Sequence, residues 1–128
     1  MVKMMKAQIE DAPILLQIQK EAFIKYAKKY GDFESNPYHM DLHRMEFNIK
    51  YRYGQYYKIL DEKSLEMIGG IFCFELDEKP IMKIAQFYFK NGYQHLGYGT
   101  YVLNELFRLN ENVKTWYVDT IMQEEYNL

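Results

Sequence analysis

The sequence predicts an α/β (α+β) domain in which a central mixed, mostly antiparallel sheet is flanked by helices. Stretches with the three-and-four spacing of apolar residues typical of helices alternate with stretches rich in Ile, Phe and Tyr, which are typical of strands. The predicted order of elements is β-α-α-β-β-β-α-β. With 128 residues, 48% of them apolar and 17% aromatic, the chain is long and apolar enough to bury one core.

The first part of the chain is predicted to hold a short strand and two helices. Residues Val2 to Ala7 have the composition of a strand, and Asp11 to Lys29 place apolar side chains at helical spacing. A second helix is predicted to start at Asn36, a favourable cap residue, followed by Pro37 in the first turn. Its apolar face continues through Met45.

Three strands are expected in the middle of the chain, joined by short polar turns into an antiparallel meander. They are Gln55 to Asp61, Glu66 to Leu76, and Ile81 to Phe89. The Gly69-Gly70 pair lies inside the second of these strands. Glycines at such a position indicate a bulge or a close approach of another backbone.

The segment that follows the meander contains two glycines, Gly97 and Gly99, and then a helical pattern that ends near Asn110. Val113 to Asp119 is predicted to form another strand. The last six residues, Gln123 to Leu128, have the pattern of the first turns of a helix.

Charge and cysteine usage exclude several classes of protein. The formal net charge is -2 and the pI is near 5.9, so there is no general positive field to attract nucleic acid or an anionic membrane. No run of eighteen apolar residues and no signal-peptide core are present. The one cysteine, Cys73, cannot form an intramolecular disulfide. We therefore expect a cytoplasmic protein, with Cys73 either a small buried hydrophobe or a catalytic thiol.

Gly97 and Gly99 stand where a helix is predicted to begin. The first turn of a helix has N–H groups without intrahelical partners and the positive end of the helix dipole, so it favours an anion. Glycines would let a phosphate reach those groups, although they could also serve turn geometry alone. A P-loop is excluded because no Gly-Lys-Ser/Thr follows, and a dinucleotide fingerprint would need glycine where Val102 stands.

The six residues Gln94-His95-Leu96-Gly97-Tyr98-Gly99 match the pattern Q/R-x-x-G-x-G/A. This pattern, between a strand and a helix, resembles the signature of the GCN5-related N-acetyltransferase (GNAT) superfamily. The resemblance extends along the chain. Lys6 to Phe23 resembles the first strand and helix of that family, Met67 to Ile71 its third strand, and Val113 to Thr120 its fifth.

The resemblance implies an acetyl-CoA-dependent N-acetyltransferase that transfers an acetyl group directly to a primary amine of a small molecule or peptide. The pyrophosphate of acetyl-CoA would lie on backbone N–H groups of the signature loop. The pantetheine arm would pair with the end of the fourth strand, where a backbone N–H near Phe89 would polarise the thioester carbonyl. The cofactor-binding residues implied are Phe87, Tyr88, Phe89, Gln94, His95, Leu96, Gly97, Tyr98, Gly99, Thr100 and Asn127.

The chain departs from the family pattern at the catalytic positions. Where a basic residue often stands beside the signature glycine, this sequence has Leu96, so binding would rest mostly on backbone groups. In place of a glutamate base early in the fourth strand it offers Lys83 and Gln86. Tyr126 is not at the position of the family's proton donor, so catalytic residues stay unassigned. We expect no metal, because His39 and His43 alone do not make a zinc site.

The expected domain covers residues 1–128 and is truncated after the fifth strand, so that the last helix and strands of the family are missing. The edge formed by 113–119 would expose Trp116 and Val118, and we expect self-association to cover it. Two other functions stay open. One is a catalytically impaired CoA-binding or regulatory module. The other treats residues 87–89 as a stacking platform for single-stranded nucleic acid, which the negative charge disfavours.

Overall fold

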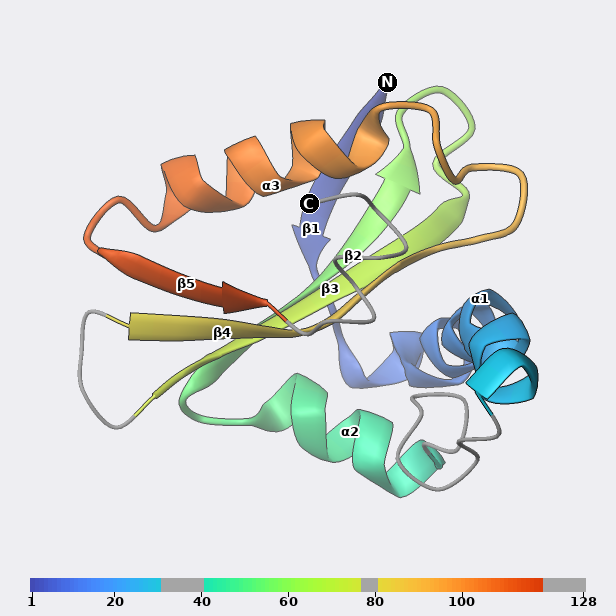
Figure 1. Ribbon diagram of the computed structural model, residues 1–128, viewed down its shortest axis with the longest axis horizontal. Helices are drawn as coiled ribbons and strands as arrows, with labels where there is room; N and C mark the ends of the chain where they lie inside the picture. The colour runs from blue at the N-terminus through green and yellow to red at the C-terminus, as the bar shows by residue number, and fades with distance from the viewer. Residues whose placement is uncertain (31–40, 77–80, 119–128) are drawn as a thin grey trace.

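The computed structural model describes residues 1–30, 41–76 and 81–118, with only the backbone described for 25–30. It contains one sheet of five strands in the order β1-β2-β3-β4-β5. Helices α1 and α2 cover one face of this sheet and α3 covers the other (Figure 1). The predicted class, a sheet flanked by helices, is confirmed.

The observed elements follow the predicted order. They are β1 Val2–Lys6, a 3-10 turn η1 Ile9–Asp11, α1 Ala12–Tyr30, α2 Leu42–Lys50, β2 Gly54–Asp61, β3 Met67–Glu75, β4 Ile81–Phe89, α3 Tyr98–Leu109 and β5 Thr115–Val118. The predicted helix start at Asn36 and the predicted final helix from Gln123 lie outside the described residues. In the described part, α2 begins at Leu42 and its cap is Asp41, whose side chain accepts a hydrogen bond from the Arg44 N–H at 2.8 Å.

The sheet is mixed and mostly antiparallel, as predicted. Strands β1 to β4 pair antiparallel in sequence order, and β5 pairs parallel with β4. A parallel neighbour requires a long crossover connection, and α3 supplies it. The β4–β5 ladder runs from Ile81 opposite Thr115 to Ile84 opposite Val118. The described part of this ladder covers the first half of β4.

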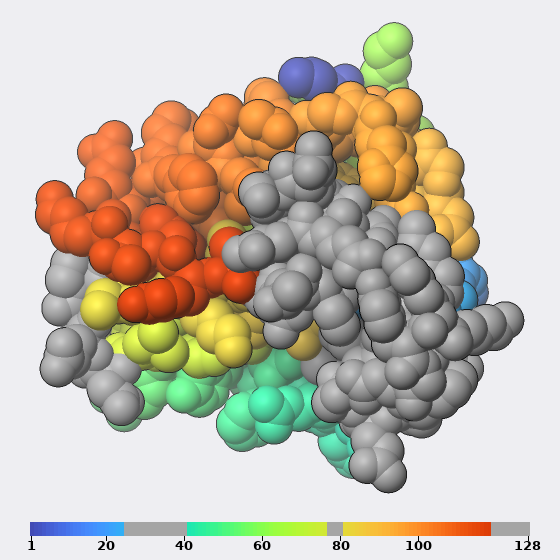
Figure 2. All heavy atoms as spheres, viewed as in Figure 1, coloured from blue at the N-terminus to red at the C-terminus, as the bar shows by residue number. Residues whose placement is uncertain are grey.

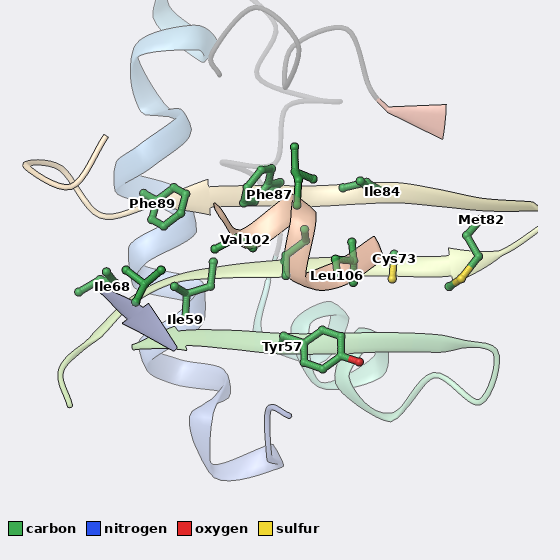
Figure 3. Close-up of a cluster of buried hydrophobic side chains, with 13 residues drawn as sticks. Tyr57, Ile59, Ile68, Cys73, Met82, Ile84, Phe87, Phe89, Val102 and Leu106 are labelled. Atoms are coloured by element: carbon green, nitrogen blue, oxygen red, sulfur yellow. The ribbon is translucent and has the colours of Figure 1, made fainter. Parts of the chain in front are cut away.

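Each face of the sheet has its own apolar core. On the α3 face, Phe87 and Phe89 of β4 pack with Val102 and Leu106 of α3, all at most 1% exposed (Figure 3). The α1/α2 face is filled by the cluster Ala12, Leu15, Ile18, Ala22, Phe23, Met45, Tyr56, Phe72 and Tyr88. At the far end of α3, the ring of Phe107 lies 5.2 Å from that of Trp116 in β5.

Two irregularities interrupt the sheet. Between β2 and β3 the register passes over Ile68, and a Cβ added to Gly69 would lie 2.4 Å from the backbone oxygen of Tyr88. Of the two alternatives predicted for the glycine pair, the close approach is confirmed at Gly69, and the bulge lies next to the pair, at Ile68. A second register shift, between β3 and β4, passes over Ala85. The second bulge was not predicted, and it directly follows Ile84, the last residue of β4 in the described part of the β4–β5 ladder.

The burial of Cys73 bears on the two roles considered for it, a buried hydrophobe and a catalytic thiol. Cys73 is 0% exposed, and its burial raises the pKa of the thiol to about 12. Cys73 lies within the core under α3, where a substrate could not reach the thiol, so the structure favours the small buried hydrophobe over the catalytic thiol. Among the helices that the structure describes, none has the length and apolarity needed to cross a bilayer.

Candidate functional site

The predicted cofactor loop lies between the carboxyl end of β4 and the start of α3. Residues 90–97 connect the two elements, and Tyr98 to Thr100 form the first turn of α3. In Figure 1 this loop extends beyond the sheet before it returns to the helix, and Figure 2 shows it at the molecular surface next to α3. The structure therefore brings Gln94 through Thr100 together at one end of the sheet.

Gly97 sets the geometry of the helix start. It is the N-cap of α3 with φ +83°, in the left-handed region that favours glycine, and a Cβ there would meet nothing within 4 Å. Gly97 has no side chain to cap this helix end, and the structure shows no capping hydrogen bond from the described residues. The first intrahelical donor is the N–H of Tyr101, which reaches the Gly97 oxygen at 3.4 Å. The N–H groups of Tyr98, Gly99 and Thr100 precede it, so they have no intrahelical acceptor.

The loop turns twice more through the left-handed region before it reaches Gly97. Gly92 has φ +93° and His95 has φ +61°. The side chain of Leu96 is 57% exposed and that of His95 is also exposed. An exposed leucine beside the open helix start offers an apolar contact and no charge, so an anion there would be held by backbone groups.

Three side chains of the loop fix it to the sheet. Gln94, in the middle of the loop, donates a hydrogen bond from Nε2 to the backbone oxygen of Phe89 at 3.0 Å. Lys90 Nζ, at the start of the loop, lies 2.7 Å from Oε1 of Glu66, and the Tyr93 hydroxyl donates to Oε2 of Glu66 at 3.3 Å. The hydrogen bond from Lys90, together with its charge, lowers the pKa of the Glu66 carboxyl. The positive charge of Lys90 is thus paired with the carboxylate of Glu66.

The side chains of Phe87, Tyr88 and Phe89 are buried on opposite faces of the sheet. Phe87 and Phe89 belong to the core under α3, whereas Tyr88 belongs to the core under α1 and α2. All three are at most 1% exposed. The hypothesis that these rings form a stacking platform for nucleic acid is therefore wrong, because bases need exposed rings on one surface.

The backbone of the same residues has a defined direction. The N–H of Lys90 donates to the oxygen of Ile68 in β3 at 2.7 Å. In an antiparallel pair, directly opposed residues alternate between hydrogen-bonded and non-hydrogen-bonded pairs. The backbone N–H and C=O groups of Tyr88 therefore point toward β3, like the N–H of Lys90. Those of Phe87 and Phe89 point to the opposite side of β4, the side of β5. This is the edge along which a pantetheine arm was predicted to pair.

We use the term fork for the place on β4 where the described part of the β4–β5 ladder stops. The described ladder stops at Ile84, the bulge at Ala85 follows, and Gln86 is the first residue beyond it. Lys83, the other polar residue considered for this strand, lies in the paired part of β4 opposite Tyr117. Only Gln86 is placed at the fork.

Two tyrosines occupy the α1/α2 face close to the fork. The hydroxyl groups of Tyr56 and Tyr88 are hydrogen-bonded to each other, and burial raises the pKa of Tyr56. A Cβ on Gly70 would lie 2.6 Å from the Tyr88 hydroxyl oxygen, so this glycine makes room for the pair. The ring of Tyr56 is stacked on Phe72 with centroids 5.4 Å apart. These hydroxyls are therefore engaged with each other inside the core.

Several residues considered from the sequence fall outside the described part of the chain. These are Asn127, Tyr126 and His39. Within residues 1–30, 41–76 and 81–118, no group of three or more His, Cys, Asp or Glu side chains is arranged to hold a metal ion. Sequence analysis also missed the role of Glu66, which is 24 positions from Lys90; no local pattern connects residues so far apart.

No protein-family model and no curated protein matches this sequence. Solved structures do resemble it. A variant of the BH1408 protein from Bacillus halodurans matches with a TM-score of 0.80 and 13% identity over 98% of this chain and 87% of that one. An acetyltransferase of the GNAT family from Staphylococcus aureus matches with a TM-score of 0.69 and 16% identity, covering 94% and 74%. A ribosomal-protein-alanine N-acetyltransferase from Brucella melitensis has a TM-score of 0.69 and 11% identity, covering 99% and 86%.

Proposed function

From the GNAT-like fold of this chain, we propose that it is an acetyl-CoA-dependent N-acetyltransferase that acts on a primary amine of a small molecule or peptide. The observation that carries this proposal is the start of α3 at Gly97, which no side chain among the described residues is shown to cap, and which lies at the end of β4, where the rings of Tyr98 and Phe89 are 6.3 Å apart. Helix starts of this kind favour a phosphate group. A strand edge beside them suits an extended, amide-bearing arm.

The diphosphate of acetyl-CoA would lie against the N–H groups of Tyr98, Gly99 and Thr100. Gly97 would contribute open space, since a Cβ there would meet nothing within 4 Å. The pantetheine arm would run along the β5-facing edge of β4 past Phe89 and Phe87. Such a course directs the thioester toward the bulge at Ala85. Binding through backbone groups is consistent with an exposed Leu96 and with a Lys90 that is paired to Glu66.

The proposed reaction needs no metal and no further reactant. The neutral amine nitrogen attacks the thioester carbonyl carbon, a C–N bond forms, and the C–S bond breaks. Coenzyme A leaves as a thiolate that takes up a proton, and the nitrogen loses one to a base or a water chain. A backbone N–H at the end of β4 would stabilise the negative charge that develops on the carbonyl oxygen.

Thermal unfolding with acetyl-CoA tests the proposal. A ligand that binds only the folded protein stabilises it by about 2.7 kcal/mol at a hundred times its Kd, so the melting temperature should rise with acetyl-CoA concentration. N,S-diacetylcysteamine, which carries the thioester without the diphosphate, is the matched control and should give a much smaller rise. A melting temperature that stays constant up to millimolar acetyl-CoA would rule out the proposed function.

Transfer of the acetyl group is then measured with spermidine, an aminoglycoside and a peptide that begins with alanine (the alanine-terminated peptide), by following release of the coenzyme A thiol. Turnover of any of these amines supports the enzyme. Binding of acetyl-CoA with no transfer to any amine would indicate the coenzyme A binding module instead.

Self-association through segment 113–119 also stays a prediction. In the described sheet β5 is the outermost strand on its side, and its Tyr117 is 53% exposed. The expectation that Trp116 and Val118 are exposed at this edge is wrong, because both are partly buried against the core under α3. Light scattering on the purified chain would test it, with a mass of twice 15.5 kDa expected for a dimer. A monomeric mass at high micromolar concentration would contradict it.

A further inference from the structure

We propose that the side-chain carbonyl oxygen of Gln86 accepts a hydrogen bond from the nitrogen of the acceptor amine and so positions it beside the fork between β4 and β5. Gln86 would be a positioning residue, because an amide oxygen can orient an N–H group but cannot remove its proton at neutral pH. This inference rests on the proposed function and assigns one residue of its amine site.

The first observation is an unmet hydrogen bond. Oε1 of Gln86 is buried, and it has no hydrogen-bond partner among the described residues. Most buried side-chain polar atoms in folded proteins have a partner, and each exception calls for an explanation. A buried acceptor left unsatisfied destabilises the folded protein. A ligand that supplies the missing donor is one explanation for keeping it.

The second observation is the position of the residue. Gln86 lies opposite Phe72 in the β3–β4 ladder, and Phe72 belongs to the core under α1 and α2. Opposed residues of an antiparallel pair place their side chains on the same face, so Gln86 belongs to the α1/α2 face. It also directly follows the bulge at Ala85.

These positions place the two proposed reactants on adjoining surfaces. The backbone of Phe87 faces the β5 side, along which the thioester arm would run, and Gln86 is the preceding residue on the strand. An amine held at Oε1 of Gln86 would therefore approach the thioester from the α1/α2 face. The other polar groups described close by, the hydroxyls of Tyr56 and Tyr88, are hydrogen-bonded to each other.

The surroundings also favour the reactive form of the amine. Phe72 is 4% exposed and Tyr88 is 0% exposed, so the site is largely apolar. Burial in such a site disfavours the charged ammonium relative to the neutral amine. Only the neutral amine can attack the thioester. A neutral amide acceptor provides an orienting hydrogen bond without the carboxylate charge that would stabilise the ammonium.

The experiment compares two glutamine-to-methionine variants. Gln55 is a matched control, because its Nε2 donates to Asn110 Oδ1 at 3.1 Å and its Oε1 accepts from the Tyr57 hydroxyl at 2.7 Å. Gln55→Met breaks satisfied hydrogen bonds and should lower the melting temperature. Gln86→Met removes an unsatisfied oxygen while keeping a similar volume, so the melting temperature of the free protein should stay the same or rise.

Kinetics provide the second measurement, with whichever of spermidine, the aminoglycoside or the alanine-terminated peptide the wild type acetylates. Gln86→Met should raise the KM for that amine at least about tenfold and leave the KM for acetyl-CoA unchanged. Gln86→Glu restores an acceptor oxygen and should recover part of the amine affinity, with a new dependence on pH as the carboxyl group titrates.

The outcomes separate this inference from the proposed function. An unchanged amine KM in Gln86→Met, or a fall in melting temperature equal to that of Gln55→Met, overturns the role of Gln86 even when acetyl-CoA stabilises the wild type. If none of the three amines is acetylated, the melting temperatures of Gln86→Met and Gln55→Met alone test the role of Gln86. The inference then requires that Gln86→Met melts above Gln55→Met. A wild type that acetyl-CoA fails to stabilise removes both proposals.

Discussion

The starts of α2 and α3 solve the same physical problem in opposite ways. At α2 the side chain of Asp41 accepts a hydrogen bond from the Arg44 N–H, and the cap backbone is extended with φ -100°. At α3 the cap is Gly97 in the left-handed region, which has no side chain to accept a hydrogen bond from the first turn. The cap side chain of α2 thus satisfies one N–H group of the first turn, whereas the cap of α3 has no side chain that could do the same.

The difference shows which helix start is suited to a ligand. A carboxylate at the N-cap both fills the position and supplies the negative charge that the helix dipole favours. Neither first turn contains an acidic residue, so the caps are what distinguish them. The carboxylate nearest to the α3 loop in the described contacts, Glu66, is bonded to Lys90 and Tyr93.

The largest expected effect comes from giving α3 the cap that α2 has. Gly97→Asp should weaken acetyl-CoA binding at least about tenfold, or ~1.4 kcal/mol, because its carboxylate would occupy the place and repel the charge of the diphosphate. Isothermal titration with acetyl-CoA measures this directly. Asp is one of the residues that tolerate the left-handed region, so the variant is expected to fold.

Gly97→Asn is the control for Gly97→Asp, since it has the same shape and backbone preference without the charge. Gly92→Asn is a second control, at another left-handed glycine of the loop with open space around it. Equal affinity of the Asp and Asn variants at position 97 would show that charge at this helix start does not matter.

The second largest effect is expected on stability, when the cap of α2 is removed. Asp41→Ala should lower the free energy of unfolding by about 1 kcal/mol, which corresponds to ~4 °C in melting temperature for a chain of this size. Asp41→Asn retains a capping oxygen and should lose much less. Acetyl-CoA affinity should not change in either variant. A drop in affinity comparable to that of Gly97→Asp would mean that the two helix starts are not independent.

The smallest effect concerns the carboxylate beside the α3 loop. The Lys90 hydrogen bond and charge lower the pKa of Glu66 from its ordinary value of 4.5. A lowered folded-state pKa gives stability that is present above the unfolded value and is lost as the pH falls through the folded value. Wild type should therefore melt slightly above Glu66→Gln at pH 7, and the difference should disappear as the pH falls through the lowered pKa of Glu66. Both partners are partly exposed, so the effect is small. A difference that grows in acid would contradict this assignment.

Local patterns in the sequence were enough to predict most of the fold. The strands and helices in the described residues lie within one or two positions of the predicted bounds, apart from the start of α2. The glycine pair at Gly69 also indicated the close approach to β4, because no side chain fits there. The uncapped helix at Gly97 was predicted from the same kind of local evidence, and its use by acetyl-CoA stays a prediction.

Features that depend on distant residues were missed. The bulge at Ala85 did leave a trace, because Met82, Ile84, Phe87 and Phe89 share one core at spacings of two, three and two, and the three breaks the strand period. The contact of Glu66 with Lys90 left none, since it joins the start of one strand to the end of another. The unmet hydrogen bond of Gln86 could not be predicted, because it depends on which neighbours surround the side chain in three dimensions.

The contact between Trp116 and Phe107 gives this protein a built-in optical reporter. Trp116 is the only tryptophan in the sequence, and its ring lies against α3 at the end opposite Gly97. Its fluorescence emission therefore reports whether the α3–β5 corner is assembled, independently of the 13 tyrosines that contribute to near-ultraviolet circular dichroism. Coincidence of the two signals during denaturation would show that this corner and the rest of the chain unfold in one cooperative step.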